Sequence, residues 1–117
     1  MTATRYDLLI EQGATFSRVV NVKQSDGTVK DLTGYALARL KIRPALDSTS
    51  EYLSLTAGSG IVFNSPAAGQ LTITIDKATT TGFTWTMGVY DCEIESPAGV
   101  VDRILRGDVT VSKEVTH

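Results

Sequence analysis

Apolar residues recur at every second position of this chain far more clearly than at every third or fourth. The clearest example is the segment at residues 71–75, where Leu71, Ile73 and Ile75 alternate with threonines. A spacing of two is the side-chain period of a β-strand, because successive side chains point to opposite faces of the sheet. The pattern therefore predicts an all-β chain in which helix is the minority state.

Turn residues separate the apolar runs and mark where strands end. The Asp26-Gly27 pair is typical of tight hairpin turns, because glycine takes a positive φ without steric cost. Asp76 is expected to cap one short helical turn, and a β-bulge at Gly107 would keep the last valines of the chain on the core side. We expect strands at residues 6–10, 14–22, 28–32, 35–43, 51–55, 61–63, 71–75, 87–95 and 100–111.

The number and spacing of these runs indicate the architecture. About eight strands separated by turn signals every 8 to 12 residues or so favour a sandwich or small barrel over a sheet built from βαβ units. We predict an immunoglobulin-like antiparallel β-sandwich with at most one short helical turn. The chain is short enough for a single domain over residues 1–117, in which residues 112–117 form a flexible tail.

Composition excludes several classes of partner. The formal net charge of -2 and pI near 5.3 lack the cationic excess by which proteins neutralise nucleic-acid phosphates. Cys92 is the single cysteine, so no internal disulfide forms. No apolar run reaches the ~18 residues of a membrane span, and the first residues do not read as a secretion signal. We expect a protein made in the cytoplasm that binds neither nucleic acid nor membrane.

No set of residues suited to catalysis stands out. The single histidine, His117, is the last residue, and Cys92 falls on the inward face of its strand with no basic partner in sequence. Asp91, Glu93 and Glu95 share the outward parity of that strand, which is more typical of a solvated face than of a pair of catalytic carboxylates. We predict a protein without enzyme activity, metal or cofactor.

Arg39, Lys41 and Arg43 alternate along one face of the strand at residues 35–43. They are candidates for contact with acidic groups on a neighbouring molecule. The same stripe also fits a soluble strand face, or an edge strand protected against pairing with another chain. The sequence leaves these alternatives open.

Phe83 and Trp85 follow Gly82 in a segment rich in threonine. Large aromatic side chains on a loop can anchor a protein interface. Alternatively both rings roof the core, since tryptophan is usually largely buried. A further interpretation is a carbohydrate-binding sandwich, in which Trp85, Phe83 and Tyr52 stack on sugar rings.

Several strings along the chain resemble a known family. They are YDLLIEQGATF at 6–16, DGTVKDLTGY at 26–35, ARLKIR at 38–43, AGQLTITI at 68–75 and GVYDCEIESPAGVVDRILRGDVTVSKEVT at 88–116. Together they are similar to the small virion structural proteins of tailed phages and prophages. The first half is also similar to the N-terminal domain of phage baseplate upper proteins.

The resemblance implies a non-enzymatic β-sandwich carried on the virion after synthesis in the host bacterial cytoplasm. Two places on the particle fit: a tail or baseplate adaptor, or a decoration on the head. Its partners would be other virion proteins of the tail, baseplate or capsid, with a homo-oligomer as an alternative. The resemblance assigns no binding residues.

Overall fold

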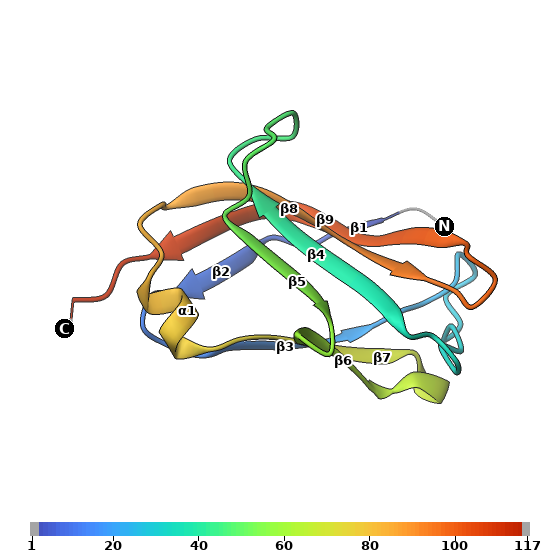
Figure 1. Cartoon of the computed structure of the whole chain (residues 1–117). Coiled ribbons are helices and arrows are strands. Elements are labelled where there is room, and N and C mark those ends of the chain that lie inside the picture. The colour runs from blue at the N-terminus through green and yellow to red at the C-terminus, as the bar shows by residue number, and fades with distance from the viewer. Residues whose placement is uncertain (1–2, 116–117) are drawn as a thin grey trace.

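The computed structural model describes residues 3–115 and is built almost entirely from strands (Figure 1). A 3-10 turn η1 (Pro66–Ala68) and a helix α1 (Lys77–Thr81) interrupt them. The strands are β1 (Thr4–Arg5), β2 (Leu8–Glu11), β3 (Phe16–Asn21), β4 (Leu37–Arg43), β5 (Leu53–Ala57), β6 (Gly60–Ser65), β7 (Gln70–Ile75), β8 (Met87–Glu95) and β9 (Val101–Ser112). The predicted all-β class is confirmed.

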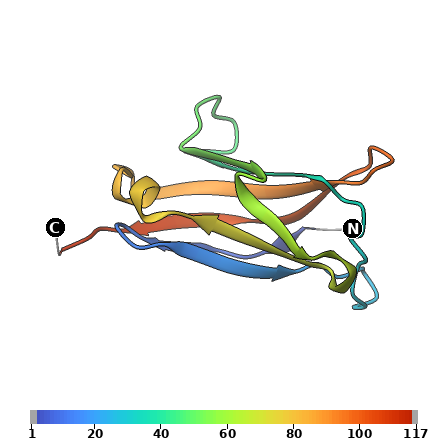
Figure 2. The same cartoon turned by 60° about the horizontal axis from the view of Figure 1, so that its bottom comes forward.

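The strands form one continuous sheet that curls into two layers. Its order is β1-β9-β8-β4-β5-β6-β7-β3, with β2 also paired to β9. Figures 1 and 2 show β4, β8 and β9 over β3, β6 and β7, and the pairing of β5 with β6 joins the two layers. The immunoglobulin-like sandwich is confirmed. Most pairs are antiparallel, and the parallel ones are β1 and β2 with β9, and β5 with β6.

The core lies between the layers and follows the alternation read from the sequence. Leu71, Ile73 and Ile75 of β7 are buried, as are Leu40 and Ile42 of β4. Their outward neighbours in both strands are more exposed. Burial of this apolar surface is the main force that stabilises the sandwich, at roughly 25 cal/mol per Å² removed from water.

The helix prediction is also confirmed. α1 begins after Asp76, whose side chain accepts a 2.8 Å hydrogen bond from the backbone N–H of Thr79. This contact satisfies one of the N–H groups that lack a partner in the first turn of a helix.

The strand expected at residues 28–32 is absent. Only an isolated bridge between Lys23 and Val29 forms there. Asp31 instead accepts hydrogen bonds from the backbone and the hydroxyl of Thr33. Such local contacts compete with ladder formation, so this segment becomes a turn, although Leu32 still inserts fully into the core.

The bulge expected at Gly107 lies elsewhere. Cys92 pairs with Leu105 while Glu93 pairs with Arg103, so the extra residue is Ile104. Ile104 and Leu105 are consecutive and both buried, and the shift keeps Val109 and Val111 inward as expected. Gly107 pairs regularly with Tyr90.

The two ends of the described chain also differ from expectation. The strand predicted at residues 6–10 is divided into β1 and β2, because the Asp7 carboxylate accepts the N–H of Asp108 where a strand partner would bind. At the other end Ser112 belongs to β9, and the N–H of Glu114 bonds to the side chain of Gln12. The last residues of the expected tail, including His117, lie outside the described residues.

Candidate docking surface

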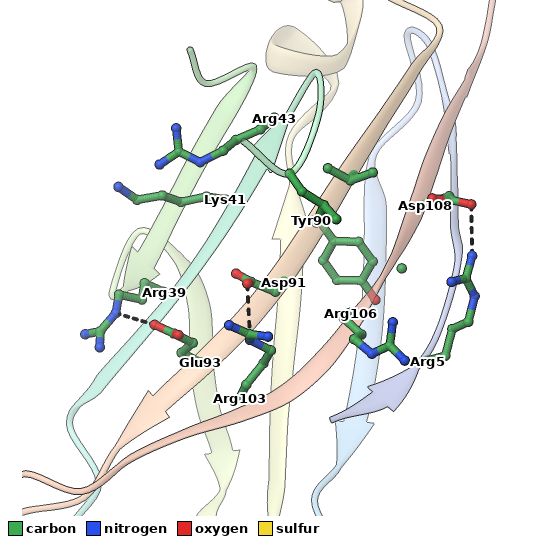
Figure 3. Close-up of a pocket in the computed structure, with 13 residues that line it drawn as sticks. Arg5, Arg39, Lys41, Arg43, Tyr90, Asp91, Glu93, Arg103, Arg106 and Asp108 are labelled. Atoms are coloured by element: carbon green, nitrogen blue, oxygen red, sulfur yellow. Dashed lines mark hydrogen bonds and ion pairs between the residues drawn. The ribbon is translucent and has the colours of Figure 1, made fainter. Parts of the chain in front are cut away.

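The outward side chains of β4, β8 and β9 form a densely charged surface (Figure 3). The strand register sets them in rows of three. β4 contributes cations, β8 contributes carboxylates and β9 contributes both. We call this surface the charged face, made of Arg39, Glu93 and Arg103 in one row, Lys41, Asp91 and Arg106 in the next, and Arg43, Val89 and Asp108 in the third.

Arg39 is held between two carboxylates of β8. Its Nε lies 3.0 Å from Glu93 Oε1 and its Nη1 lies 3.4 Å from Glu95 Oε1. The hydrogen bond to Glu93 raises the pKa of Arg39 above its ordinary value. The guanidinium therefore stays charged and fixed in the row.

Lys41 and Arg43 share one carboxylate from outside the face. Glu51 Oε1 lies 2.9 Å from Lys41 Nζ and 3.5 Å from Arg43 Nη2. The hydrogen bond from Lys41 lowers the pKa of Glu51 below its usual value. The single carboxylate of Glu51 thus forms ion pairs with both cations.

The β9 side of the face has paired and unpaired cations. Arg103 lies 3.3 Å from Asp91, and Arg5 of β1 lies 2.9 Å from Asp108 and 3.3 Å from Asp7. Arg106 is exposed and forms no ion pair with any residue from 3 to 115.

A cavity of about 440 Å³ lies over these rows. Its charged lining residues are six cations and three carboxylates. The loop between β4 and β5 projects from the domain (Figures 1 and 2), and its Leu46, which is 91% exposed, borders the same cavity. Asp7, Glu51 and Glu95 pair with these cations from outside the lining, so the cations and carboxylates of the charged face balance. Leu46 adds an apolar side chain at the rim of the hollow.

This arrangement suits recognition better than folding stability. Ion pairs between partly exposed side chains contribute only about 0 to 1 kcal/mol each. Fixed charges of this kind do give an arriving partner a defined electrostatic pattern, which sets the orientation and rate of association.

The residues with catalytic potential in the sequence lie in buried or ion-paired surroundings. Residues 3–115 contain no group of His, Cys, Asp and Glu side chains that could hold a metal. Burial raises the pKa of the Cys92 thiol to about 12, so it carries no thiolate at neutral pH. Asp91 and Glu93 are paired with arginines.

The predicted stripe Arg39, Lys41 and Arg43 is brought together with its counter-charges. One alternative for the stripe is wrong, because β4 pairs with both β5 and β8 and is not an edge strand. Contact with a neighbouring molecule and a soluble face remain the two interpretations.

The predicted aromatic pair does not line the cavity of the charged face and is used in packing. Phe83 is only 5% exposed, as in the alternative where it roofs the core. Trp85 is partly buried, stacks on Tyr52 with a centroid separation of 4.4 Å, and lies 4.9 Å from Phe83. Tyr52 covers one face of the indole, so the aromatic rings named for sugar stacking are largely occupied by one another.

Sequence reasoning missed Arg5, Arg106, Asp108 and Glu51. The alternation of β9 could have placed Asp108, but the bulge at Ile104 shifts its parity between Arg103 and Arg106. Nothing in the sequence indicates that Glu51 returns to Lys41, or that Arg5 meets a residue 103 positions away.

Comparisons with known proteins identify the fold but show no family. No family model matches the chain, and no curated protein matches it. Within residues 3–115 no helix is long and apolar enough to cross a membrane.

Two solved structures are similar in shape. The immunoglobulin-like domain of mouse leukocyte-associated immunoglobulin-like receptor 1, crystallised as a strand-swapped dimer, matches with a TM-score of 0.50 at 21% identity. That match covers 92% of this chain and 88% of the receptor domain. CopC from Methylosinus trichosporium OB3b matches with a TM-score of 0.47 at 13% identity, over 94% of this chain and 89% of that one. The receptor domain supports an immunoglobulin-like fold for this chain.

Proposed function

We propose that this protein is a non-enzymatic structural component of a tailed phage particle, a tail or baseplate adaptor or a head decoration, and that it works by protein docking. The virion role rests on the resemblance of its sequence strings to small phage virion proteins. The observation that carries the docking mechanism is the charged face, a hollow of ordered ion pairs in which Arg106 is the one lining cation without an ion pair among residues 3–115. Its partner is another virion protein that presents an acidic group to Arg106.

Arg106 is the residue best suited to test this mechanism. It lies in the middle row of the charged face and has no ion pair in the described part of the chain, so it is available to an acidic partner. Replacing it breaks no internal pair. Lys77 on α1 is a matched control, because it is also exposed and unpaired among the described residues but does not line the cavity.

The experiment is affinity capture from dissociated phage particles, with purified chain as bait and mass spectrometry as the readout. We expect wild type and Lys77→Glu to capture the same structural protein. We expect Arg106→Glu to capture at least about tenfold less, since a like charge at an interface is repelled. Equal capture by all three baits would remove the charged face from the mechanism.

Self-association is part of the same proposal. The similar receptor domain forms a strand-swapped dimer, which shows one kind of homo-oligomer that this fold allows. Light scattering over a concentration series distinguishes a discrete oligomer of this chain from a monomer that needs a different virion protein.

A further inference from the structure

β3 has a free edge. It pairs with β7, and no other strand of the described chain pairs with it. On the β7 side, Val22 donates its N–H to the carbonyl of Gly69. Hydrogen-bonding direction alternates along a strand, so the N–H and C=O groups of Val19, Asn21 and Lys23 point away from β7. These groups are available to an additional strand.

A groove of about 750 Å³ lies beside this edge, between β3 and the β1 and β9 pair. Apolar side chains that are almost fully buried form part of its lining, namely Val20, Val22, Ile104 and Leu105. Lys23 is the only charged residue that lines the groove, and it forms no ion pair among residues 3–115. The groove therefore combines unpaired backbone groups, an apolar lining and one free cation.

We propose that this groove takes an extended segment of a partner protein, which adds a strand to β3 along residues 19–23. The segment's backbone would pair with the outward groups of Val19, Asn21 and Lys23, and alternate apolar side chains would enter the groove. An acidic side chain would face Lys23. This surface is distinct from the charged face, and the proposal does not depend on a place in a phage particle.

A second copy of the chain fits this edge less well than a separate segment. The carbonyl of Ser17 also points to the free edge, but Arg18 donates to it at 2.8 Å. The same guanidinium lies 4.6 Å from the centre of the Phe16 ring. Antiparallel pairing of two β3 strands about Val19 would displace this contact. A segment confined to residues 19–23 leaves it in place.

The test begins with a yeast-displayed library of random peptides of about ten residues, enough to span the groove at ~3.3 Å per residue, selected on the purified full chain. We expect enriched peptides with alternating apolar residues and an acidic residue. Selection on Lys23→Glu is expected to replace the acidic residue with a basic one. Affinity of synthetic copies is then measured by fluorescence anisotropy.

Two proline variants separate strand addition from other modes of binding. Asn21→Pro removes an N–H that faces the groove, and Ser17→Pro removes one on the same edge outside it. Proline is tolerated on edge strands where no ladder bond is lost, so both variants should fold. We expect Asn21→Pro to weaken binding at least about tenfold and Ser17→Pro to change it less than about twofold.

N-methylated peptides test the same pairing without altering the protein. Two series of peptides are methylated at alternate N–H groups. Methylation of the N–H groups that face β3 should abolish binding, and methylation of those that face away should not. The proposal is overturned if no peptide is enriched, or if the two methylation series bind wild type equally. It is also overturned if light scattering finds a dimer that Asn21→Pro abolishes, which would assign the edge to a second copy.

Discussion

Gly107 illustrates how a neighbouring backbone segment can restrict a position to glycine. A Cβ at this position would lie 2.6 Å from the carbonyl oxygen of Tyr6 and 2.7 Å from Oδ1 of Asp7. Gly107 is not among the glycines with positive φ, so glycine is needed for space and not for a left-handed backbone. A glycine inside a strand pattern indicates either a bulge or a close approach, and here it is a close approach.

We predict that Gly107→Ala lowers the free energy of unfolding by about 2 kcal/mol, because overpacking against fixed backbone costs roughly that much. Urea denaturation measures the change. Gly82→Ala is the control, since its Cβ would meet nothing closer than 3.5 Å. Gly82→Ala should leave stability unchanged or raise it by under about 1 kcal/mol. Equal destabilisation by both variants would contradict the account.

Cys92 is expected to be chemically inert in the folded protein. It is fully buried, and burial raises the pKa of its thiol to about 12. Thiol reagents attack the thiolate, so labelling at pH 8 should require unfolding. A colorimetric thiol assay in buffer and in guanidinium measures both states. Rapid labelling of the native protein would show that the thiol is accessible.

Three aspartates stabilise turns in the same way. The side chains of Asp26, Asp31 and Asp76 accept hydrogen bonds from Thr28, Thr33 and Thr79, and these bonds lower the pKa of each carboxyl below its ordinary value. The folded state thus binds fewer protons than the unfolded state as pH falls. Their contribution is present above the unfolded pKa and is lost as pH falls through the folded pKa.

We therefore predict that the free energy of unfolding decreases on acidification below about pH 4. A variant with all three aspartates changed to asparagine should show a shallower decrease. Asp47→Asn, in the exposed β4–β5 loop, should keep the wild-type slope. Urea midpoints measured from pH 2 to 5 or so give the comparison, and a steeper slope in the triple variant would refute the assignment.

At the scale of strands, a buried tyrosine connects β8 to the chain between β1 and β2. The Tyr90 hydroxyl donates a hydrogen bond to the carbonyl of Tyr6, and the N–H of Tyr6 donates to the backbone carbonyl of Arg106. Burial raises the pKa of Tyr90, so the hydroxyl remains a donor at any physiological pH. This contact holds the first strands on β9, beside the charged face.

Tyr90→Phe should lower the free energy of unfolding by about 1 to 2 kcal/mol, because the carbonyl of Tyr6 loses its donor. Hydrogen exchange should also show faster exchange at the Tyr6 amide. Tyr35→Phe is the control, since the Tyr35 ring packs near Phe63 and its hydroxyl has no hydrogen bond within the described chain. Unchanged exchange at Tyr6 in Tyr90→Phe would contradict the proposed link.

The sequence predicts a strand best where apolar and polar residues alternate regularly and the strand pairs with a long strand on each side. The strand expected at 87–95 has the observed bounds of β8, and the strand at 71–75 differs from β7 by one residue. The bulge is predicted at Gly107 and not at Ile104, because the sequence does not show that the consecutive apolar residues Ile104 and Leu105 are both buried. The segment at 28–32 was misassigned because a local aspartate turn outweighs strand propensity there.

At the scale of the whole molecule, the two candidate surfaces lie on different parts of the sandwich. The charged face covers β4, β8 and β9, and the groove follows the free edge of β3. A domain with two separate candidate surfaces can contact two partners at once, which the proposed adaptor role would require. The cations of β4 were predictable from alternation. Arg106 and the free edge were not, because they depend on which strands meet across the fold.

The most direct test of the proposed function is quantitative mass spectrometry of phage particles purified on a density gradient. We predict that this chain is present in a constant ratio to other structural proteins. We also predict that Arg106→Glu lowers that ratio while Lys77→Glu does not. Complete, infectious particles that lack the chain would contradict the account.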